Sequence, residues 1–276
     1  MNDWQLIVDW HALGEDEREL LIGELWCHDI SGIEERDDVA VVGFSSEFTA
    51  RAAAVAIDRA IRSVTSTIVE VADDSYLDEW RAFARPWRVD RLFIRPSWVE
   101  AAPPPDTTLI VIDPARSFGS GAHASTRLVL ELLQQIDLRG RTVLDIGCGS
   151  GVLSLAAAAL GAARVDAIDI EPGAVDATMT NARRNEFDDR IHARVATIER
   201  VDTPFDVVVA NVLPSVHREI ANDVRGRAWL FAIAAGMFEG QAAEIASAYG
   251  ATTVATRAED QWIALLLQVD RTERGL

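Results

Sequence analysis

An apolar strand runs directly into a glycine-rich turn at Val143-Leu144-Asp145-Ile146-Gly147-Cys148-Gly149-Ser150-Gly151. The glycines stand at alternate positions, and Val152 occupies the place where the dinucleotide-binding pattern Gly-x-Gly-x-x-Gly has its last glycine. A backbone without Cβ atoms at a strand end lets a bulky ligand lie against the loop and the start of the next helix. An ordinary strand-to-helix turn is the alternative. Together with the acidic residue that follows, the pattern predicts a nucleotide-binding α/β domain.

That acidic residue is Asp169, eighteen positions beyond Gly151 and at the end of the next apolar run. A carboxylate there can accept hydrogen bonds from both hydroxyls of a ribose, as the acid of dinucleotide-binding folds does. A salt-bridged surface aspartate is the alternative. Glu171 is a second, less favoured candidate, because it points to the opposite side of an extended segment. The glycine spacing favours S-adenosylmethionine over NAD as the nucleotide.

Two further segments are expected at the same end of the sheet, because ligands of such folds bind at the carboxyl ends of the strands. Asn211 opens Asn-Val-Leu-Pro after a strand at 205–210, and its side-chain oxygen can accept a hydrogen bond from an amine and orient the nitrogen lone pair. Its alternative role is to cap a turn. Thr126 lies in the segment 118–127, in the first turn of a predicted helix, from which it can reach the cofactor. For His123 in this segment, a structural or capping role is favoured over proton transfer.

The composition is that of a globular protein, with 276 residues of which 49% are hydrophobic and 25% charged. The formal net charge is −18, and all 26 basic residues are arginine. Such acidity argues against bare nucleic acid as a partner, and the lack of lysine excludes P-loop and Schiff-base chemistry. A basic protein would be attracted to this charge, although a solvated acidic surface explains it equally well.

Neither a membrane span nor a metal centre is expected. The uncharged run at 152–163 is too short and too rich in alanine to cross a bilayer, and the first residues lack the basic flank of a signal peptide. The two cysteines, Cys27 and Cys148, are far apart, so they build neither a disulfide framework nor a Cys-x-x-Cys site. We therefore expect a cytoplasmic enzyme.

Hydrophobic periodicity divides the chain into three parts. Residues 1–72 predict a small α+β domain with the order strand-helix-strand-strand-helix-strand, the ferredoxin-like arrangement. Residues 73–105 predict an ordered linker with an acidic, aromatic helix at 78–83 and a short strand at 92–94. Residues 106–276 predict a doubly wound, mostly parallel sheet that begins with a strand at 109–112 and ends in an antiparallel pair at 228–234 and 262–268.

A resemblance to a known family is carried by six segments: 78–133, 145–151, 167–171, 211–213, 236–241 and 259–262. In order and spacing they resemble the ribosomal protein L11 methyltransferase (PrmA) family. The resemblance implies a ferredoxin-like recognition domain joined by a linker to a Rossmann-like class I methyltransferase domain, which trimethylates amino groups of a large-subunit ribosomal protein. It also implies that S-adenosylmethionine is contacted by Thr126, Gly147, Asp169 and Asn211.

The expected function is methyl transfer from S-adenosylmethionine to lysine or N-terminal amino groups of a basic, L11-type ribosomal protein, by a monomer that uses no metal. A deprotonated amine would attack the methyl group in line and release S-adenosylhomocysteine, with Asn211 and neighbouring carbonyls orienting the amine and no general base assigned. Two alternatives stay open: transfer to a lysine of another protein, such as an electron-transfer flavoprotein subunit, and a non-catalytic module that binds S-adenosylmethionine. A dehydrogenase is a more remote alternative.

Overall fold

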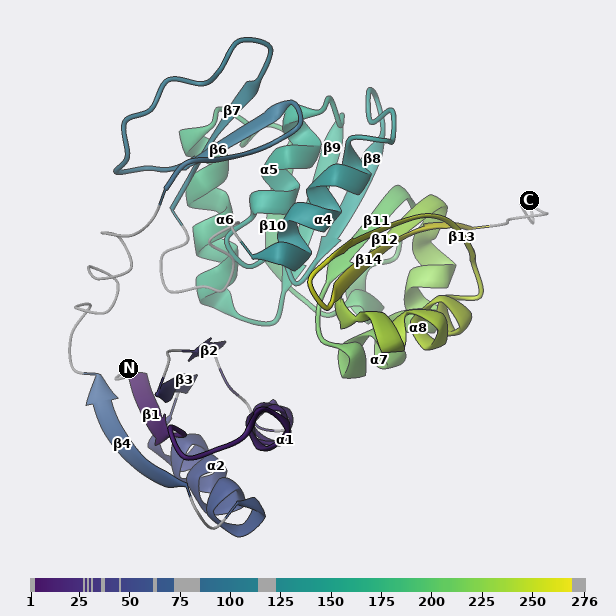
Figure 1. Cartoon of the computed structure of the whole chain (residues 1–276). Coiled ribbons are helices and arrows are strands. Elements are labelled where there is room, and N and C mark those ends of the chain that lie inside the picture. The colour runs from purple at the N-terminus through teal and green to yellow at the C-terminus, as the bar shows by residue number, and fades with distance from the viewer. Residues whose placement is uncertain are drawn as a thin grey trace. The chain divides into compact units, whose positions relative to one another are not determined.

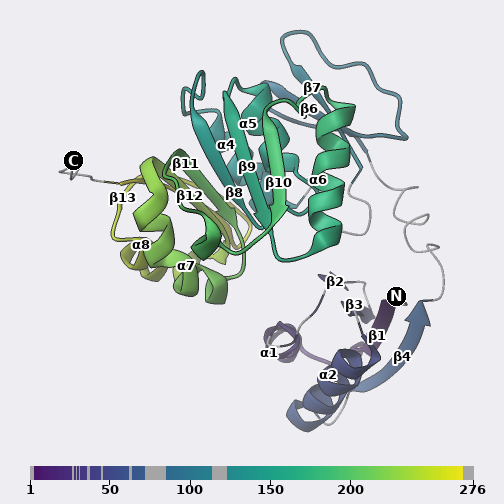
Figure 2. The same ribbon diagram turned by 180° about the vertical axis from the view of Figure 1, so that it is seen from behind.

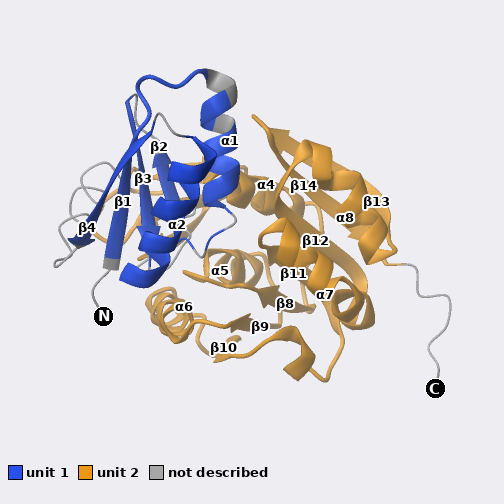
Figure 3. Cartoon of the chain, turned by 90° about the horizontal axis from the view of Figure 1, so that it is seen from below, with its two compact units in different colours: residues 1–84 blue, residues 85–276 orange. Residues whose placement is uncertain are grey.

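A computed structural model describes residues 3–26, 28, 30, 32–35, 38–44, 46–61, 64–71, 85–113 and 123–269. The chain divides into two compact units, Met1–Ala84 and Arg85–Leu276, which are blue and orange in Figure 3. Of the linker expected at 73–105, residues 73–84 with their predicted helix lie outside the described residues. Residues 85–105 belong to the second unit.

The first unit has the predicted strand-helix-strand-strand-helix-strand order. Its elements are β1 (Asp3–Asp9), α1 (Glu15–Leu25), β2 (Gly32–Glu35), β3 (Val39–Phe44), α2 (Glu47–Ala60) and β4 (Thr65–Val71). The sheet order is β2-β3-β1-β4, with antiparallel neighbours throughout. Leu6 of β1 and Ile57 of α2 are buried in one core, so one face of the sheet carries the helices. Ser46 starts α2 because its side chain accepts a hydrogen bond from the backbone N of Thr49 at 3.2 Å.

A seven-stranded sheet forms the centre of the second unit. Its strands are β8 (Thr142–Ile146), β9 (Arg164–Asp169), β10 (Ile191–Val195), β11 (Phe205–Asn211), β12 (Ala228–Phe238), β13 (Thr252–Glu259) and β14 (Trp262–Gln268). The order is β10-β9-β8-β11-β12-β14-β13, in which the first five strands run parallel and β14 runs antiparallel to β12. The doubly wound sheet and the antiparallel pair β12–β14 are therefore as predicted, whereas β13, antiparallel to β14, was not expected.

One predicted strand forms, but it belongs to a different sheet from the one expected. The run at 109–112 forms β7 (Thr108–Ile112), which lies outside the large sheet and instead pairs with β6 (Leu92–Pro96) and, through it, with β5 (Trp87–Val89). The backbone of β7 is also bound by two side chains. Asn185 accepts from Val111 N and donates to Val111 O at 2.8 and 2.7 Å, and Asn181 does the same for Asp113 at 2.9 and 2.7 Å. These amides satisfy backbone groups that a neighbouring strand would otherwise satisfy.

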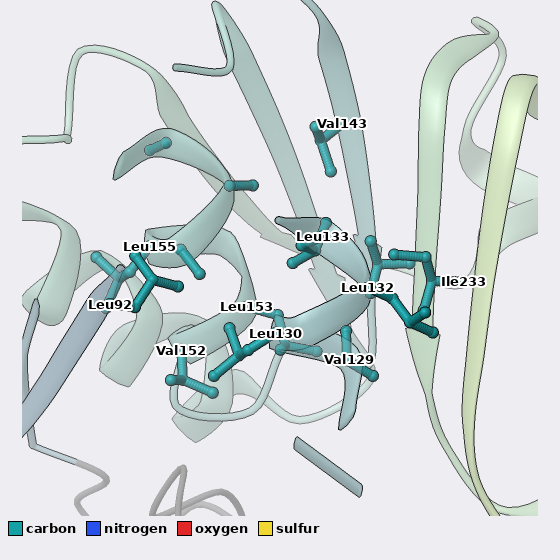
Figure 4. Packing of buried hydrophobic residues seen from close by; sticks show 14 of the residues in the cluster. Leu92, Val129, Leu130, Leu132, Leu133, Val143, Val152, Leu153, Leu155 and Ile233 are labelled. Carbon is teal, nitrogen blue, oxygen red and sulfur yellow. The ribbon is translucent and has the colours of Figure 1, made fainter. Parts of the chain in front are cut away.

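Helices cover both faces of the large sheet (Figures 1 and 2). One face carries α4 (Ala124–Leu133), α5 (Val152–Ala159) and α6 (Pro172–Arg184), and the other carries α7 (Pro214–Arg227) and α8 (Ala242–Tyr249). Short 3-10 helices lie at Ile198–Arg200 and Glu239–Gln241. Successive residues of a strand face opposite sides, so Val143 packs with α4 and α5 and Leu144 packs with α7. Figure 4 shows the first core, in which side chains of α4 and α5 gather with Val143 and Ile233. Across the parts of the chain that the structure describes, no helix is both long and apolar enough to span a membrane.

Candidate functional site

The candidate site lies at what we call the carboxyl edge, the sheet edge formed by the ends of β8, β9 and β11. Gly147 follows β8 and donates from its backbone N to Ile168 O at 2.9 Å, with φ at +70°. A Cβ on Gly147 would lie 2.8 Å from Cγ1 of Val212, and a Cβ on Gly151 would lie 2.9 Å from Oγ1 of Thr178. Both glycines are therefore required by their backbone conformation and by the close packing of Val212 and Thr178 against the loop.

Asp169 ends β9, next to the glycine loop. Its Oδ2 accepts a hydrogen bond from Gly149 N at 3.0 Å, and its Oδ1 accepts one from Glu171 N at 3.0 Å. Two backbone donors thus fix the carboxylate, and each oxygen keeps a lone pair for a further donor such as a ribose hydroxyl. Glu171, the less favoured candidate, is an exposed residue at the N-terminal cap of α6.

Thr126 and Asn211 meet at the same edge although 85 positions separate them. Thr126 is buried in the first turn of α4, and Nδ2 of Asn211 donates to its Oγ1 at 3.4 Å. This contact leaves Oδ1 of Asn211 as the free acceptor of the amide. Since the Val212 side chain beside Asn211 abuts Gly147, all four residues predicted to contact the cofactor lie along one edge.

His123 has the capping role favoured from the sequence. Its Nδ1 accepts from the backbone N of Ser125 at 3.3 Å, at the start of α4. Burial and the nearby Arg127 lower the pKa of His123 below its usual value, so the ring is neutral at physiological pH. The ring also stacks edge-on against Trp262, with 4.6 Å between centroids, and Trp262 in turn contacts Phe238 at 4.7 Å. These three aromatic rings lie together where β12 ends and β14 begins.

Asp145 is a site residue that the sequence reasoning passed over. It is 1% exposed, Ser154 Oγ donates to its Oδ2 at 2.6 Å, and its Oδ1 has no hydrogen-bond partner among the described residues. Burial raises the pKa of Asp145 to about 6, and the carboxylate of Asp169 adds to this effect. The available signal was an acidic residue inside an otherwise apolar strand, directly before the glycines.

Helix α6 holds the glycine loop from the side. Thr178 Oγ1 donates to Gly149 O at 3.0 Å, and the buried Asn181 donates from Nδ2 to Ser150 O at 2.9 Å. Because the two side chains are three positions apart, they lie on one face of the helix. No motif marks these residues, since only the packing of α6 against the loop brings them there. Among the residues whose positions are described, no group of three His, Cys, Asp or Glu side chains is arranged to hold a metal ion.

Comparisons with known proteins match the chain to the family that its sequence resembles. A family model described as ribosomal protein L11 methyltransferase (PrmA) matches residues 26–270. The ribosomal protein L11 methyltransferase of Aeromonas hydrophila is 40% identical over 186 residues, or 66% of this chain and 63% of the relative, so the chain matches somewhat less than two thirds of that relative's length. The enzyme of the same name from Symbiobacterium thermophilum is 39% identical over 204 residues, covering 71% of this chain and 66% of the relative. The crystal structure of a ribosomal protein L11 methylase from Lactobacillus delbrueckii subsp. bulgaricus has a TM-score of 0.61 and 28% identity, covering 66% of this chain and 96% of that one.

Proposed function

Because the chain belongs to the ribosomal protein L11 methyltransferase (PrmA) family, we propose that it transfers methyl groups from S-adenosylmethionine to lysine or N-terminal amino groups of ribosomal protein L11. The observation that carries the proposal is the meeting of Thr126, Gly147, Asp169 and Asn211 at the carboxyl edge of a class I methyltransferase fold. One half of this site suits a nucleotide, and the other half suits an amine.

Three features of the site fit S-adenosylmethionine. The glycine loop lies beside Asp169, because Gly149 N donates to that carboxylate, and its glycines carry no side chain at the strand end. The carboxylate of Asp169 is fixed in place with lone pairs left for ribose hydroxyls. Oδ1 of Asp145, which has no partner within the described part of the chain, is a buried acceptor suited to a cationic group of the ligand.

The chain's own part in the reaction is to hold and orient the amine. When bound, the cofactor supplies an electrophilic methyl group on a sulfonium ion, and its demethylated product is S-adenosylhomocysteine. Oδ1 of Asn211 would accept an N–H of the acceptor amine and so orient the nitrogen lone pair toward the methyl group that the cofactor would supply. His123 uses its Nδ1 to cap α4, so we assign the prior loss of the amine proton to solvent.

We further propose that the first unit receives the substrate. Residues 1–84 carry nineteen acidic residues against six arginines, a net charge of −13 out of −18 for the whole chain. A basic ribosomal protein would be drawn to such a surface, and the −18 charge argues against direct nucleic acid binding. Ribosomal proteins are made and modified in the cytoplasm, where we place this enzyme, acting as a monomer.

Ribosomal proteins from cells that lack the enzyme provide the test. We expect incubation with radiolabelled S-adenosylmethionine to label L11 alone, with mass spectrometry locating the methyl groups on its amino groups. Labelling of a different protein in whole lysate would replace L11 as the substrate and favour the other-lysine alternative. No labelling at all, with cofactor binding intact, would favour the non-catalytic module.

A matched variant separates the enzyme from the binding module at the same site. In Asn211→Ala, we expect S-adenosylhomocysteine to bind within about threefold of the wild-type affinity while methyl transfer falls by about 100-fold, because the amine loses its oriented acceptor. Calorimetry gives the affinity and the radiolabel gives the rate. Equal losses of both would mean that Asn211 serves the cofactor only.

A further inference from the structure

A buried imidazole lies directly behind the loop that follows Asn211. His217 of α7 is fully buried and makes two side-chain hydrogen bonds, one between Nδ1 and the hydroxyl of Tyr249 at 2.7 Å and one between Nε2 and the backbone O of Ala235 at 2.8 Å. Tyr249, on α8, is itself buried. Neither residue belongs to the predicted site.

The partners fix the tautomer of this ring. A carbonyl oxygen can only accept, so Nε2 of His217 carries the hydrogen and donates it to Ala235 O. Nδ1 must then be the acceptor, and the Tyr249 hydroxyl donates to it. Burial lowers the pKa of His217 to about 4, which keeps the ring neutral at physiological pH. The direction of both hydrogen bonds is therefore set.

The carbonyl of Ala235 has a second donor, and that donor belongs to the 211–213 loop, which begins with Asn211. Val212 N donates to Ala235 O at 3.1 Å, immediately after Asn211, whose register partner on β12 is Ala235. The next residue, Gly236, has φ at +90°, and a Cβ there would lie 2.4 Å from Val212 O. Finally, His217 N donates to Leu213 O at 3.1 Å. That last bond is the first backbone bond of α7, so the imidazole itself holds the loop through Ala235 O.

We propose that His217, backed by Tyr249, is a positioning residue for methyl transfer: it holds the Ala235 carbonyl, and with it the 211–213 loop, in the geometry that presents Asn211 to the acceptor amine. This inference rests on the proposed function. A core position would be filled by an apolar side chain at lower cost than by an imidazole that needs two partners. The ring instead supplies a donor to the one carbonyl that also receives the loop's N–H.

Loss of the hydrogen bond from His217 to Ala235 O should lower turnover and leave binding nearly unchanged. Displacing an orienting group by a fraction of an ångström slows an in-line transfer while leaving most of the binding contacts intact. His217→Leu fills similar space without a donor, and His217→Gln keeps an N–H that can reach Ala235 O. We expect His217→Leu to lower kcat at least tenfold, with KM for L11 and Kd for S-adenosylhomocysteine within about threefold of wild type. His217→Gln should recover kcat to within about threefold, and Tyr249→Phe should fall between the two.

Two measurements separate positioning from general stability. Val224→Ala changes a buried residue of the same helix and core without touching the loop, so at a Tm matched to His217→Leu it should keep the wild-type kcat. Hydrogen exchange at the Val212 amide, which needs no substrate, should be faster in His217→Leu and unchanged in Val224→Ala. The proposal is overturned if His217→Leu keeps its kcat, if His217→Gln is as slow as His217→Leu, or if Val212 exchange does not change. If wild type methylates no protein while Val212 exchange still responds to His217, the proposed function fails but the bracing of the loop stands.

Discussion

The folded protein disfavours the ionised form of the Asp145 carboxyl. Its pKa is raised from 3.8 to about 6 because burial penalises the charged form more than the Ser154 hydrogen bond favours it. The folded state therefore binds this proton more tightly than the unfolded state does. The free energy of unfolding falls as pH rises from about 4 to about 6, and the penalty is complete above that window. A raise of about two pKa units corresponds to roughly 2–3 kcal/mol at neutral pH.

Asp145→Asn should therefore stabilise the protein without its cofactor. We expect a higher Tm than wild type at pH 7.5, a difference that shrinks toward zero at pH 4.5, and at the same time weaker binding of S-adenosylmethionine. The variant loses the buried charge, which is costly alone and useful once a cationic ligand is present. Thermal unfolding at the two pH values checks this, with the exposed Asp176→Asn as control. A pH-independent difference in Tm would contradict the assignment of the effect to the Asp145 charge.

Among the secondary-structure elements, the apolar runs that lead directly into a motif were assigned correctly. The strands β8, β9 and β11 and the helix α4 lie where they were predicted. The run that forms β7 was given to the wrong sheet, because a short apolar run carries no information about its partner. In the site, Gly147 and Asp169 could be found because motifs require them, whereas Asp145 was passed over. Asn181 and His217 could not, since only tertiary packing brings their side chains to the loops.

Two asparagines, Asn181 in α6 and Asn185 at its C-terminal cap, allow the role of that helix to be tested. Asn181 and Asn185 both pair with the backbone of β7, but only Asn181 also donates to Ser150 O in the glycine loop. Replacing either by Ala leaves part-buried backbone groups without these partners, at a cost of about 1 kcal/mol each. We expect both variants to lower Tm, whereas only Asn181→Ala should weaken S-adenosylhomocysteine binding, by about tenfold in calorimetry. Equal affinities in the two variants would show that α6 supports the fold and not the loop.

Across the whole molecule, most of the net negative charge lies in the first unit. The first unit carries −13 in 84 residues, and the second carries −5 in 192, although the predicted chemistry lies in the second. Exposed charges attract a partner over roughly 10 Å at 0.1 M salt and are screened as the salt concentration rises. If the acidic unit captures a basic substrate, salt should act on substrate binding and leave the cofactor site unaffected.

We therefore expect KM for L11 to rise about tenfold between 50 and 300 mM NaCl while kcat and the affinity for S-adenosylhomocysteine stay nearly constant. The double variant Asp38→Asn and Asp58→Asn, at exposed positions of the first unit, should raise KM severalfold at 50 mM and have little effect at 300 mM, because salt already screens these charges. Asp188→Asn with Asp202→Asn, equally exposed in the second unit, is the matched control and should leave KM unchanged at both salt concentrations. Steady-state kinetics with purified L11 measures all three proteins. Equal effects of the two double variants would mean that the net charge of the whole chain, and not the first unit, attracts the substrate. A KM that does not respond to salt would mean that the acidic surface of the first unit serves only to keep the protein solvated.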